Sequence, residues 1–244
     1  MARIYSNCYE LMSEMGRNLW EMGAIVTPKT YQNKVIEGNE DFITKELICE
    51  QYVLTSLDQE EMLFIYDKQS KPWAKAELRE RIGMKPLNPG EAYRIREHLW
   101  EEFLSSQGTF DYTYSERFNH NNNFENLIEL LKRDPDTRQG ILPVFSLDDP
   151  AVSGGKKRIP CSMYYDFLIR KNAIDESVLH VNYHQRSCDF VAHFGNDVWL
   201  AYKTMMYIAG RLNIKPGYLT HTIDSLHTYK RDWIKLKNSL NETL

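Results

Sequence analysis

Cys161 stands in a setting that favours a nucleophilic thiol. The basic residues Lys156, Lys157 and Arg158 precede it closely, and Arg186 would lie near it if the next strand pairs back. Positive charge near a thiol depresses its pKa and favours the thiolate, which is the attacking form. A single cysteine at the start of a strand is more often a buried structural residue. Cys161 therefore indicates a nucleophile only in combination with other residues.

Two polar segments downstream of Cys161 carry groups that suit a phosphorylated sugar. Arg186 and Ser187 can hold a phosphate through charge-assisted and hydroxyl hydrogen bonds. His227 and Tyr229 offer two donors for a sugar hydroxyl. Each pair taken alone is more often structural, so the hypothesis of a nucleotide site depends on their occurring together.

The composition is that of an ordinary globular protein and excludes several classes. The 244 residues suffice for one domain with a sizeable core, and 42% of them are hydrophobic. The net charge of −4 argues against a binder of polymeric nucleic acid, which would carry a broad basic face. No apolar run approaches the roughly 20 residues that span a bilayer, and the N-terminal residues show no signal-peptide pattern, so we expect a cytoplasmic protein without membrane contact.

The four cysteines show no metal-binding or disulfide pattern. Cys8, Cys49, Cys161 and Cys188 have neither CxxC spacing nor a partnered histidine motif. A zinc site or a disulfide framework is therefore not expected, and each cysteine is predicted to be a free thiol in a reducing compartment.

Apolar periodicity and breaker residues predict helices first and a sheet afterwards. Helices are expected over residues 9–22, 45–56, 94–104, 123–132 and 197–212, and strands over residues 140–145, 162–170 and 178–184. A helical excursion bounded by proline-containing turns is expected near residues 57–90. This order indicates an α+β layered fold in a single domain spanning residues 1–244.

Five separated motifs together resemble the thymidylate synthase family in order and approximate spacing. They are Trp100 with Tyr114 fourteen residues later, Asp134-Pro135-Asp136-Thr137-Arg138, Pro160-Cys161, Arg186-Ser187-Cys188-Asp189 and His227-Thr228-Tyr229. The resemblance covers roughly residues 95–233 and is thinner before them. It implies a layered sheet packed with helices, a homodimer, a pyrimidine nucleoside monophosphate as substrate and 5,10-methylenetetrahydrofolate as cofactor.

The resemblance also implies a role for each catalytic residue. Cys161 would attack C6 of the pyrimidine ring, which makes C5 nucleophilic toward a one-carbon unit. Tyr114 would lie beside the thiol and help proton movement at C5, with Trp100 as the family's active-site tryptophan. The family's helical glutamate best matches Glu50, for which Glu60 and Glu61 are rivals.

Further roles follow for the substrate-binding residues. Arg186 and Ser187 would hold the phosphate. Arg138 would reach it from the other subunit, and Gln139 stands where the family has a second arginine. Lys29 matches a phosphate-loop cation, although the usual Arg-Thr-Gly pattern is absent.

The remaining substrate contacts concern the sugar and the orientation of the base. His227 and Tyr229 would bind the 3′ hydroxyl of the sugar. Asp189 would orient the base or the end of the sheet through backbone contacts.

Asp197 occupies the position where thymidylate synthases have the asparagine that recognises uracil. A carboxylate can accept from the N4 amino group of cytosine and favours a proton on N3, which also makes C6 a better electrophile. The run Phe194-Gly195-Asn196-Asp197 is similar to the phage-type deoxycytidylate hydroxymethylases. The predicted substrate is therefore a cytidine monophosphate. A one-residue shift to Asn196 would restore uracil recognition, and a first-turn helix cap is the structural alternative for Asp197.

The outcome at C5 depends on whether water or hydride captures the methylene unit. Fifteen residues follow Tyr229, and the folate-covering tail typical of thymidylate synthases is missing, which favours a wetter site and hydroxymethyl transfer. His193 stands where the family usually has glycine. The predicted product is 5-hydroxymethylcytidylate. A uridylate or cytidylate methylase and a non-catalytic nucleotide-binding homologue stay open, as does the choice between ribose and deoxyribose.

Overall fold

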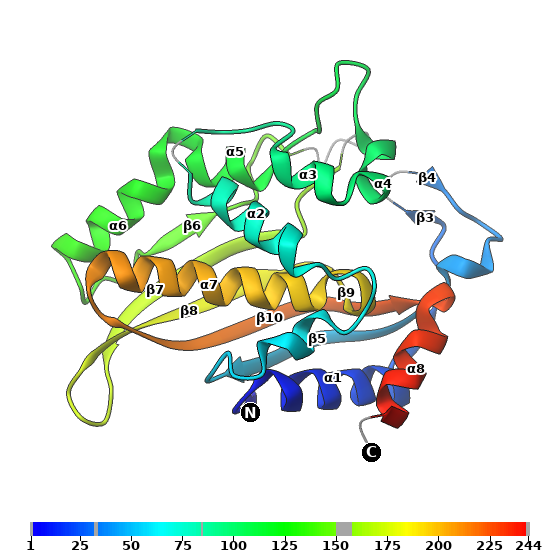
Figure 1. Cartoon of the computed structure of the whole chain (residues 1–244), viewed down its shortest axis with the longest axis horizontal. Coiled ribbons are helices and arrows are strands. Elements are labelled where there is room, and N and C mark those ends of the chain that lie inside the picture. The colour runs from blue at the N-terminus through cyan, green and yellow to red at the C-terminus, as the bar shows by residue number, and fades with distance from the viewer. Residues whose placement is uncertain (1, 32–33, 84, 150–157, 243–244) are drawn as a thin grey trace.

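A mixed β-sheet forms the centre of the protein in a computed structural model that describes residues 2–31, 34–83, 85–149 and 158–242 (Figure 1). The strand order is β1-β5-β10-β8-β7-β6. The bounds are β1 Arg3–Tyr5, β5 Thr44–Leu54, β6 Ile141–Pro143, β7 Ser162–Lys171, β8 Ser177–Gln185 and β10 Lys215–Tyr229. Two short strands, β2 Ala24–Val26 and β9 Cys188–Asp189, pair with β5 and β10. The pair β3 Thr30–Tyr31 and β4 Lys34–Val35 forms a separate hairpin.

Helices cover the sheet in layers. The long helix α7 Gly195–Leu212 crosses one face, and α2 Lys71–Arg81, α5 Tyr114–Asn119 and α6 Asn123–Arg133 lie beyond it (Figure 1). Helices α1 Cys8–Met22 and α8 Trp233–Glu242 pack together at the opposite end. The short turns α3 Glu91–Ile95, α4 Glu97–Trp100 and η3 Glu101–Phe103 lead into α5. This arrangement confirms the α+β layered fold.

A row of buried rings crosses four strands beneath the start of α7. Tyr52 on β5 is paired with His221 on β10, which is paired with Tyr183 on β8, which is paired with Tyr165 on β7. All four residues are almost completely buried. Phe194, directly before α7, packs on both Tyr52 and His221. Apolar and ring contacts of this kind fix α7 on the sheet, which positions the first turn of that helix.

Most predicted elements are confirmed, including the strands β6, β7 and β8 and the helices α1, α6 and α7. The helix predicted over residues 45–56 is wrong, because this segment is strand β5. The buried residues Thr44, Leu47, Tyr52 and Leu54 change parity along the strand, in which Cys49 has a φ of +56°. That change hides the two-residue period by which a strand is recognised.

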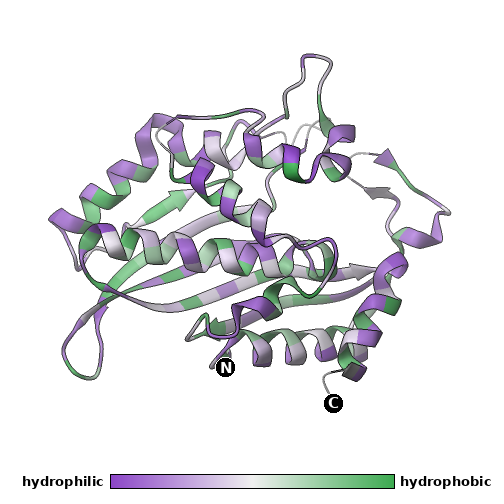
Figure 2. Ribbon diagram, in the orientation of Figure 1, coloured by the Kyte–Doolittle hydropathy of each residue, from purple (hydrophilic) through white to green (hydrophobic). Residues whose placement is uncertain are grey.

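The segment over residues 57–90, expected to form a helical excursion, includes two helical elements and packs against the rest of the protein. It contains η2 Glu60–Phe64 and α2, and α2 contacts both α5 and α7. Figure 2 shows green, hydrophobic positions on α7 and the strands that it covers, whereas the long turn after β7 is largely purple. No helix in the described part of the chain is long and apolar enough to cross a membrane.

Candidate active site

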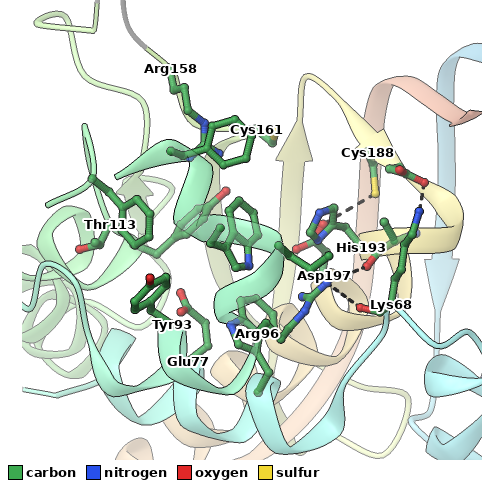
Figure 3. Close-up of a pocket in the computed structure, with 18 of the residues that line it drawn as sticks. Lys68, Glu77, Tyr93, Arg96, Thr113, Arg158, Cys161, Cys188, His193 and Asp197 are labelled. Atoms are coloured by element: carbon green, nitrogen blue, oxygen red, sulfur yellow. Dashed lines mark hydrogen bonds between the residues drawn. The ribbon is translucent and has the colours of Figure 1, made fainter. Parts of the chain in front are cut away.

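A cavity of about 240 Å³ lies where α2, the segment before α5, the start of α7 and the end of β10 meet. Its lining comes from segments far apart in the sequence, as the close-up in Figure 3 shows. Eight of the predicted site residues line it: Trp100, Tyr114, Cys161, Ser187, Asp189, Asp197, His227 and Tyr229. The fold therefore brings together the thiol, the carboxylates and the hydroxyl donors that the motifs single out.

Cys161 is half-buried directly before β7, and Arg186 lies beside it. One guanidinium nitrogen of Arg186 is 4.0 Å from the Cys161 Sγ atom. The same side chain donates from Nε to the Pro160 carbonyl at 2.9 Å and from Nη2 to the Ile159 carbonyl at 3.0 Å. These two bonds hold the charge next to the thiol.

The expected depression of the Cys161 pKa is corrected by the structure. Burial raises the pKa of the thiol, and this effect outweighs the lowering by Arg186 and Arg158. The other two basic residues of the sequence argument, Lys156 and Lys157, lie outside the described residues. The described surroundings thus hold Cys161 as a thiol from which a proton must be removed, with Arg186 and Arg158 placed to stabilise the resulting charge.

Tyr114 is tied to the residue that follows the nucleophile. It begins helix α5, which is capped by Thr113 and Glu116 in a capping box. The Tyr114 hydroxyl accepts from the Ser162 backbone N–H at 3.4 Å and from Ser162 Oγ at 3.2 Å. Burial holds the pKa of Tyr114 well above its usual value. A neutral phenol therefore stands near Cys161.

Asp197 faces the cavity from the first turn of α7. Its Oδ2 atom accepts from Gln185 Nε2 at 2.9 Å and lies 3.7 Å from Cys188 Sγ. Burial raises the pKa of Asp197 to about 6, against a lowering by the Gln185 hydrogen bond and by Arg81. This carboxyl group changes its charge near neutral pH, as groups at functional sites often do.

Asn196 points away from the cavity, although it precedes Asp197. It is fully buried, and its Oδ1 atom accepts from the Ser70 backbone N–H at 3.0 Å at the start of α2. Its Nδ2 atom donates to the Ala192 carbonyl at 3.4 Å. Consecutive helical residues point in directions about 100° apart, so only one of the two can face the ligand. The structure does not bring Asn196 to the cavity.

Asp189 and the end of β10 form the wall opposite α2. Asp189 Oδ1 accepts from the backbone N–H groups of Val191 and Ala192, both at 3.1 Å, and so caps the turn before α7. His227 and Tyr229 stand on β10 with ring centroids 5.1 Å apart. Alternation along this strand places both on the same side, toward the cavity.

Several predicted residues lie elsewhere in this chain. Lys29 is exposed and 3.9 Å from Glu37, and Arg138 is exposed after α6. Glu50 stands on β5, 3.8 Å from Arg3, and not on a helix. None of these three is among the described residues that line the cavity, and the same is true of Arg186.

The rival glutamates do not reach the cavity in the described part of the chain either. Glu60 accepts from Lys71 at 2.8 Å and from Trp199 Nε1 at 2.9 Å, and Glu61 is exposed. The glutamates that do line it, Glu77 and Glu80, both come from α2. The described glutamates that line the cavity thus come from a helix, whereas Glu50 lies on a strand.

Glu77 belongs to an ion pair that the sequence reasoning missed. Its Oε1 atom is 2.8 Å from Arg81 Nε, and Arg81 is only 2% exposed. The Arg81 guanidinium lies 4.0 Å from the ring centroid of Tyr114, and Nη1 donates to the Tyr165 hydroxyl at 3.4 Å. The i,i+4 spacing was the only signal, and it is equally typical of a solvated pair.

His193 and Arg96 complete the side of the cavity near Trp100. The rings of His193 and Trp100 have centroids 5.5 Å apart. Burial lowers the pKa of His193 to about 3, so its imidazole is neutral. Arg96 is 3% exposed and donates from Nη2 to the Lys68 carbonyl at 2.5 Å, as Figure 3 shows.

Comparisons with known proteins agree with the motifs and the fold. The family model described as "Thymidylate synthase" matches residues 83–244. A Methanosarcina acetivorans protein named "Putative thymidylate synthase" is 29% identical over 151 residues, covering 59% of this chain and 65% of that protein. A Lactococcus lactis protein named "Thymidylate synthase" is 24% identical over 223 residues, covering 88% of this chain and 73% of its own.

The structural likeness extends over nearly the whole chain. Thermostable thymidylate synthase A from Bacillus subtilis superposes with a TM-score of 0.72 at 17% identity, covering 97% of this chain and 84% of that one. The sequence matches span 58% to 65% of the length of the Methanosarcina acetivorans and Methanosarcina mazei relatives. Because the family model matches well over half of the residues, the chain belongs to the thymidylate synthase family.

Proposed function

We propose that the protein transfers a one-carbon unit from 5,10-methylenetetrahydrofolate to C5 of a cytidine monophosphate, giving 5-hydroxymethylcytidylate. The observation that carries the proposal is the pairing of Cys161 with Asp197 in one cavity while Asn196 is turned away. The cysteine supplies the family's chemistry. The carboxyl group supplies the choice of base.

Attack on the ring would begin at Cys161. Removal of its proton gives a thiolate that Arg186, 4.0 Å away, stabilises. The thiolate adds to C6, and the electron pair of the C5–C6 double bond moves onto C5, N3 and the exocyclic group. C5 thereby becomes nucleophilic. The neutral Tyr114 hydroxyl, which accepts from Ser162, is suited to carry a proton to or from this region.

Asp197 would recognise cytosine by sharing one proton with N3. The free energies of the two forms, carboxylate with protonated N3 and carboxylic acid with neutral N3, are close when the pKa of Asp197 is about 6. In the carboxylate form, an oxygen also accepts from the N4 amino group. Uracil has an N3–H group and an O4 acceptor, so a carboxylate close to O4 repels it.

The sugar and the phosphate would extend from the base toward β9 and β10. Ser187, His227 and Tyr229 line that side of the cavity and carry hydroxyl and ring donors. Arg186 adds a cation close to Ser187. Asp189 is occupied by two backbone N–H groups, which supports an orienting role for it.

A homodimer would bring Arg138 and Lys29 to the phosphate. Arg138 is exposed and outside the cavity of its own chain, which suits a residue that serves a partner. Ile48 on β5 is 73% exposed and Tyr164 on β7 is 39% exposed, each next to a buried residue of the core. Alternation along a strand places them on the outer face of the sheet, which a second subunit would cover.

The folate fits the aromatic side of the cavity. Tyr93, Trp100, Phe103 and Phe110 line that side and give flat surfaces for a fused ring system. When bound, methylenetetrahydrofolate supplies the one-carbon unit at the oxidation level of formaldehyde. Trp100 and its neighbours orient that ring system and shield it from bulk solvent.

Hydroxymethyl transfer requires a water molecule beside C5, and His193 supports this outcome. Its imidazole is neutral and lies against Trp100, so one ring nitrogen can accept a hydrogen bond from water. Methyl transfer would require hydride instead. The second candidate function is therefore a C5 methylase on dCMP or dUMP, favoured by the names of the relatives.

The product of a single incubation tests the proposal. The purified protein is mixed with tetrahydrofolate, formaldehyde and either dCMP, CMP or dUMP, and the nucleotides are analysed by mass. The expected result is a hydroxymethyl adduct on dCMP or CMP that the Cys161→Ala variant does not form. A methylated product supports the second candidate. Release of tritium from [5-³H]dCMP that is equal with Cys161→Ala, or absent with both proteins, would exclude catalysis through this thiol.

A further inference from the structure

We propose that Tyr52, His221 and Gln185 are positioning residues that act on the nucleotide base through Asp197. They form one buried hydrogen-bond chain that reserves one carboxyl oxygen of Asp197 for protein donors and leaves the other to the ligand. None of the three is among the described residues that line the cavity, so their effect must pass through Asp197. The inference rests on the proposed function for the identity of the base.

The chain is continuous over three hydrogen bonds. The Tyr52 hydroxyl is 2.8 Å from His221 Nδ1. His221 Nε2 is 2.8 Å from Gln185 Oε1. Gln185 Nε2 is 2.9 Å from Asp197 Oδ2. Each link is within normal hydrogen-bond distance, and strands β5, β10 and β8 each contribute one member.

The donors in this chain all point toward Asp197. Gln185 Oε1 can only accept, so His221 Nε2 carries the hydrogen. Burial lowers the pKa of His221 to about 3, so the ring is neutral and its Nδ1 atom accepts from the Tyr52 hydroxyl. The hydroxyl of Tyr52 thus fixes the tautomer of His221. That tautomer in turn fixes the amide orientation of Gln185.

The polarity of the chain decides where a proton on Asp197 goes. Oδ2 receives the Gln185 N–H group and faces the Cys188 thiol at 3.7 Å, so its lone pairs are engaged. A proton that binds Asp197 therefore goes to Oδ1. An Oδ1–H group can donate to the unprotonated N3 of cytosine, whereas the N3–H group of uracil would meet a second hydrogen.

The rings around His221 allow little reorientation. His221 stacks on Tyr183 with centroids 4.6 Å apart and planes 21° apart. It also lies parallel to Phe194, with centroids 6.2 Å apart. Tyr52 and His221 are 0% exposed and Gln185 is 1% exposed. Packing of this density keeps side chains in single rotamers, so the chain holds its direction.

Other titratable groups also surround Asp197, and their contribution is separable. Besides Tyr52 itself, those that interact with it are Arg81 from α2, Arg96 from the turn after α3, Tyr114 from α5, Cys161 before β7, Tyr165 from β7, Tyr183 from β8, and Cys188 from β9. None of them is a member of the chain. Removing the Tyr52 hydroxyl leaves all of them in place.

The test uses Tyr52→Phe, which keeps the ring and removes only the hydroxyl. Without it, His221 can adopt its other tautomer, and Gln185 can turn its Oε1 atom toward Asp197. Urea unfolding is measured between pH 4 and pH 8 for each protein and for its Asp197→Asn counterpart. The difference in free energy of unfolding between each protein and its Asp197→Asn counterpart becomes constant above the pKa of Asp197 in the folded protein. No nucleotide is needed.

We expect the difference to become constant near pH 6 in the unmodified protein. In Tyr52→Phe this pH should rise by about 0.5 to 1 unit, because the Asp197 carboxylate loses the hydrogen bond from Gln185. The matched control is Tyr202→Phe. Tyr202 lies on the same helix as Asp197, and its buried hydroxyl donates to the Thr55 and Gly217 carbonyls. The Tyr202→Phe control should leave this pH unchanged. An unchanged pH in Tyr52→Phe, or an equal rise in Tyr202→Phe, would overturn the proposal.

A second pair of variants keeps the test decisive if Tyr52→Phe does not fold. His221→Gln retains one donor and one acceptor, whereas His221→Leu retains neither. The pH at which the difference becomes constant should stay near its original value in His221→Gln and rise in His221→Leu. Equal behaviour of the two would contradict the chain. Failure of dCMP turnover would refute the proposed function while leaving these results in force.

Discussion

The cavity has a base end and a phosphate end, named for the parts of the proposed nucleotide. A single chain supplies more of the residues at the base end than at the phosphate end. At the base end, Cys161, Tyr114 and Asp197 are half-buried, and each has a neighbour within 4.0 Å that fixes it. At the phosphate end, Arg138 and Lys29 are exposed and outside the cavity. Under the proposed function, the contrast means that a single chain would preorganise the ring chemistry, while a second subunit would complete the charge for the phosphate.

The largest expected effect comes from the base end. Cys161→Ala should lower turnover by at least about a thousandfold, because the covalent route through C6 is lost. Nucleotide binding should persist within severalfold, as measured by equilibrium dialysis of dCMP. The exposed Cys49→Ala variant is the control and should keep full activity. Substantial turnover by Cys161→Ala would show that the base end works without its thiol.

Asp197→Asn should lower kcat/KM for dCMP by about a hundredfold and raise it for dUMP, because an amide matches the uracil edge. The measurement is steady-state turnover of both nucleotides. A matched loss on both substrates would mean that Asp197 supports the fold of the site and does not select the base. Asn196→Asp is unsuitable as a control, since Asn196 is fully buried against Ser70.

The same variant should change stability with a defined pH dependence. The pKa of Asp197 is about 6 in the folded protein, above its unfolded value, so stability from this group is lost as the pH rises toward 6. Asp197→Asn should therefore stabilise the protein by about 1 to 2 kcal/mol at pH 8 and have little effect at pH 4. Urea unfolding at both pH values checks this. Stabilisation by Asp197→Asn at pH 4 but not at pH 8 would contradict the predicted direction of the pH dependence.

At the phosphate end, Arg138→Ala should raise KM for the nucleotide by about tenfold to a hundredfold, as for loss of a charge-assisted hydrogen bond. Arg138→Ala and Cys161→Ala subunits, unfolded and refolded together, should regain activity, because mixed dimers contain one complete site. If the refolded mixture regained no activity, Arg138 would not belong to the partner's site. Arg133→Ala, exposed at the end of α6, is the control.

The last prediction concerns the pH profile of the base end. Neutral cytosine requires a proton on Asp197, so kcat/KM for dCMP should fall above pH 6 by up to about tenfold per pH unit. Turnover at saturating folate between pH 5.5 and pH 8.5 measures the fall. Asp197→Asn should lack this limb, and its persistence in that variant would assign it to another group.

Much of the fold and of the base end could be predicted from the sequence. Strand β7 follows its β-branched and aromatic residues, and the motif positions of Cys161, Asp197 and His227 converge on one cavity. Strand β5 could not be predicted, because its buried positions change parity along the strand. A local pattern cannot reveal that change of parity.

The two α2 glutamates that line the cavity escaped prediction for a different physical reason. Glu77 and Arg81 have the spacing of a solvated ion pair, and the packing of α2 against Tyr114, Phe118 and Tyr165 buries Arg81. Glu50 was preferred because residues 45–56 were expected to be helical, and it lies on a strand outside the cavity. Burial of a charged pair depends on tertiary contacts, which local spacing does not encode.

A competition between two substrates tests the central claim most directly. Equal concentrations of dCMP and dUMP are incubated together with the protein, tetrahydrofolate and formaldehyde, and both nucleotides are followed by mass. Recognition through Asp197 predicts that dCMP gains the hydroxymethyl group while dUMP is left unchanged, and that Asp197→Asn reverses this preference. Modification of dUMP alone by the unmodified protein would contradict the account.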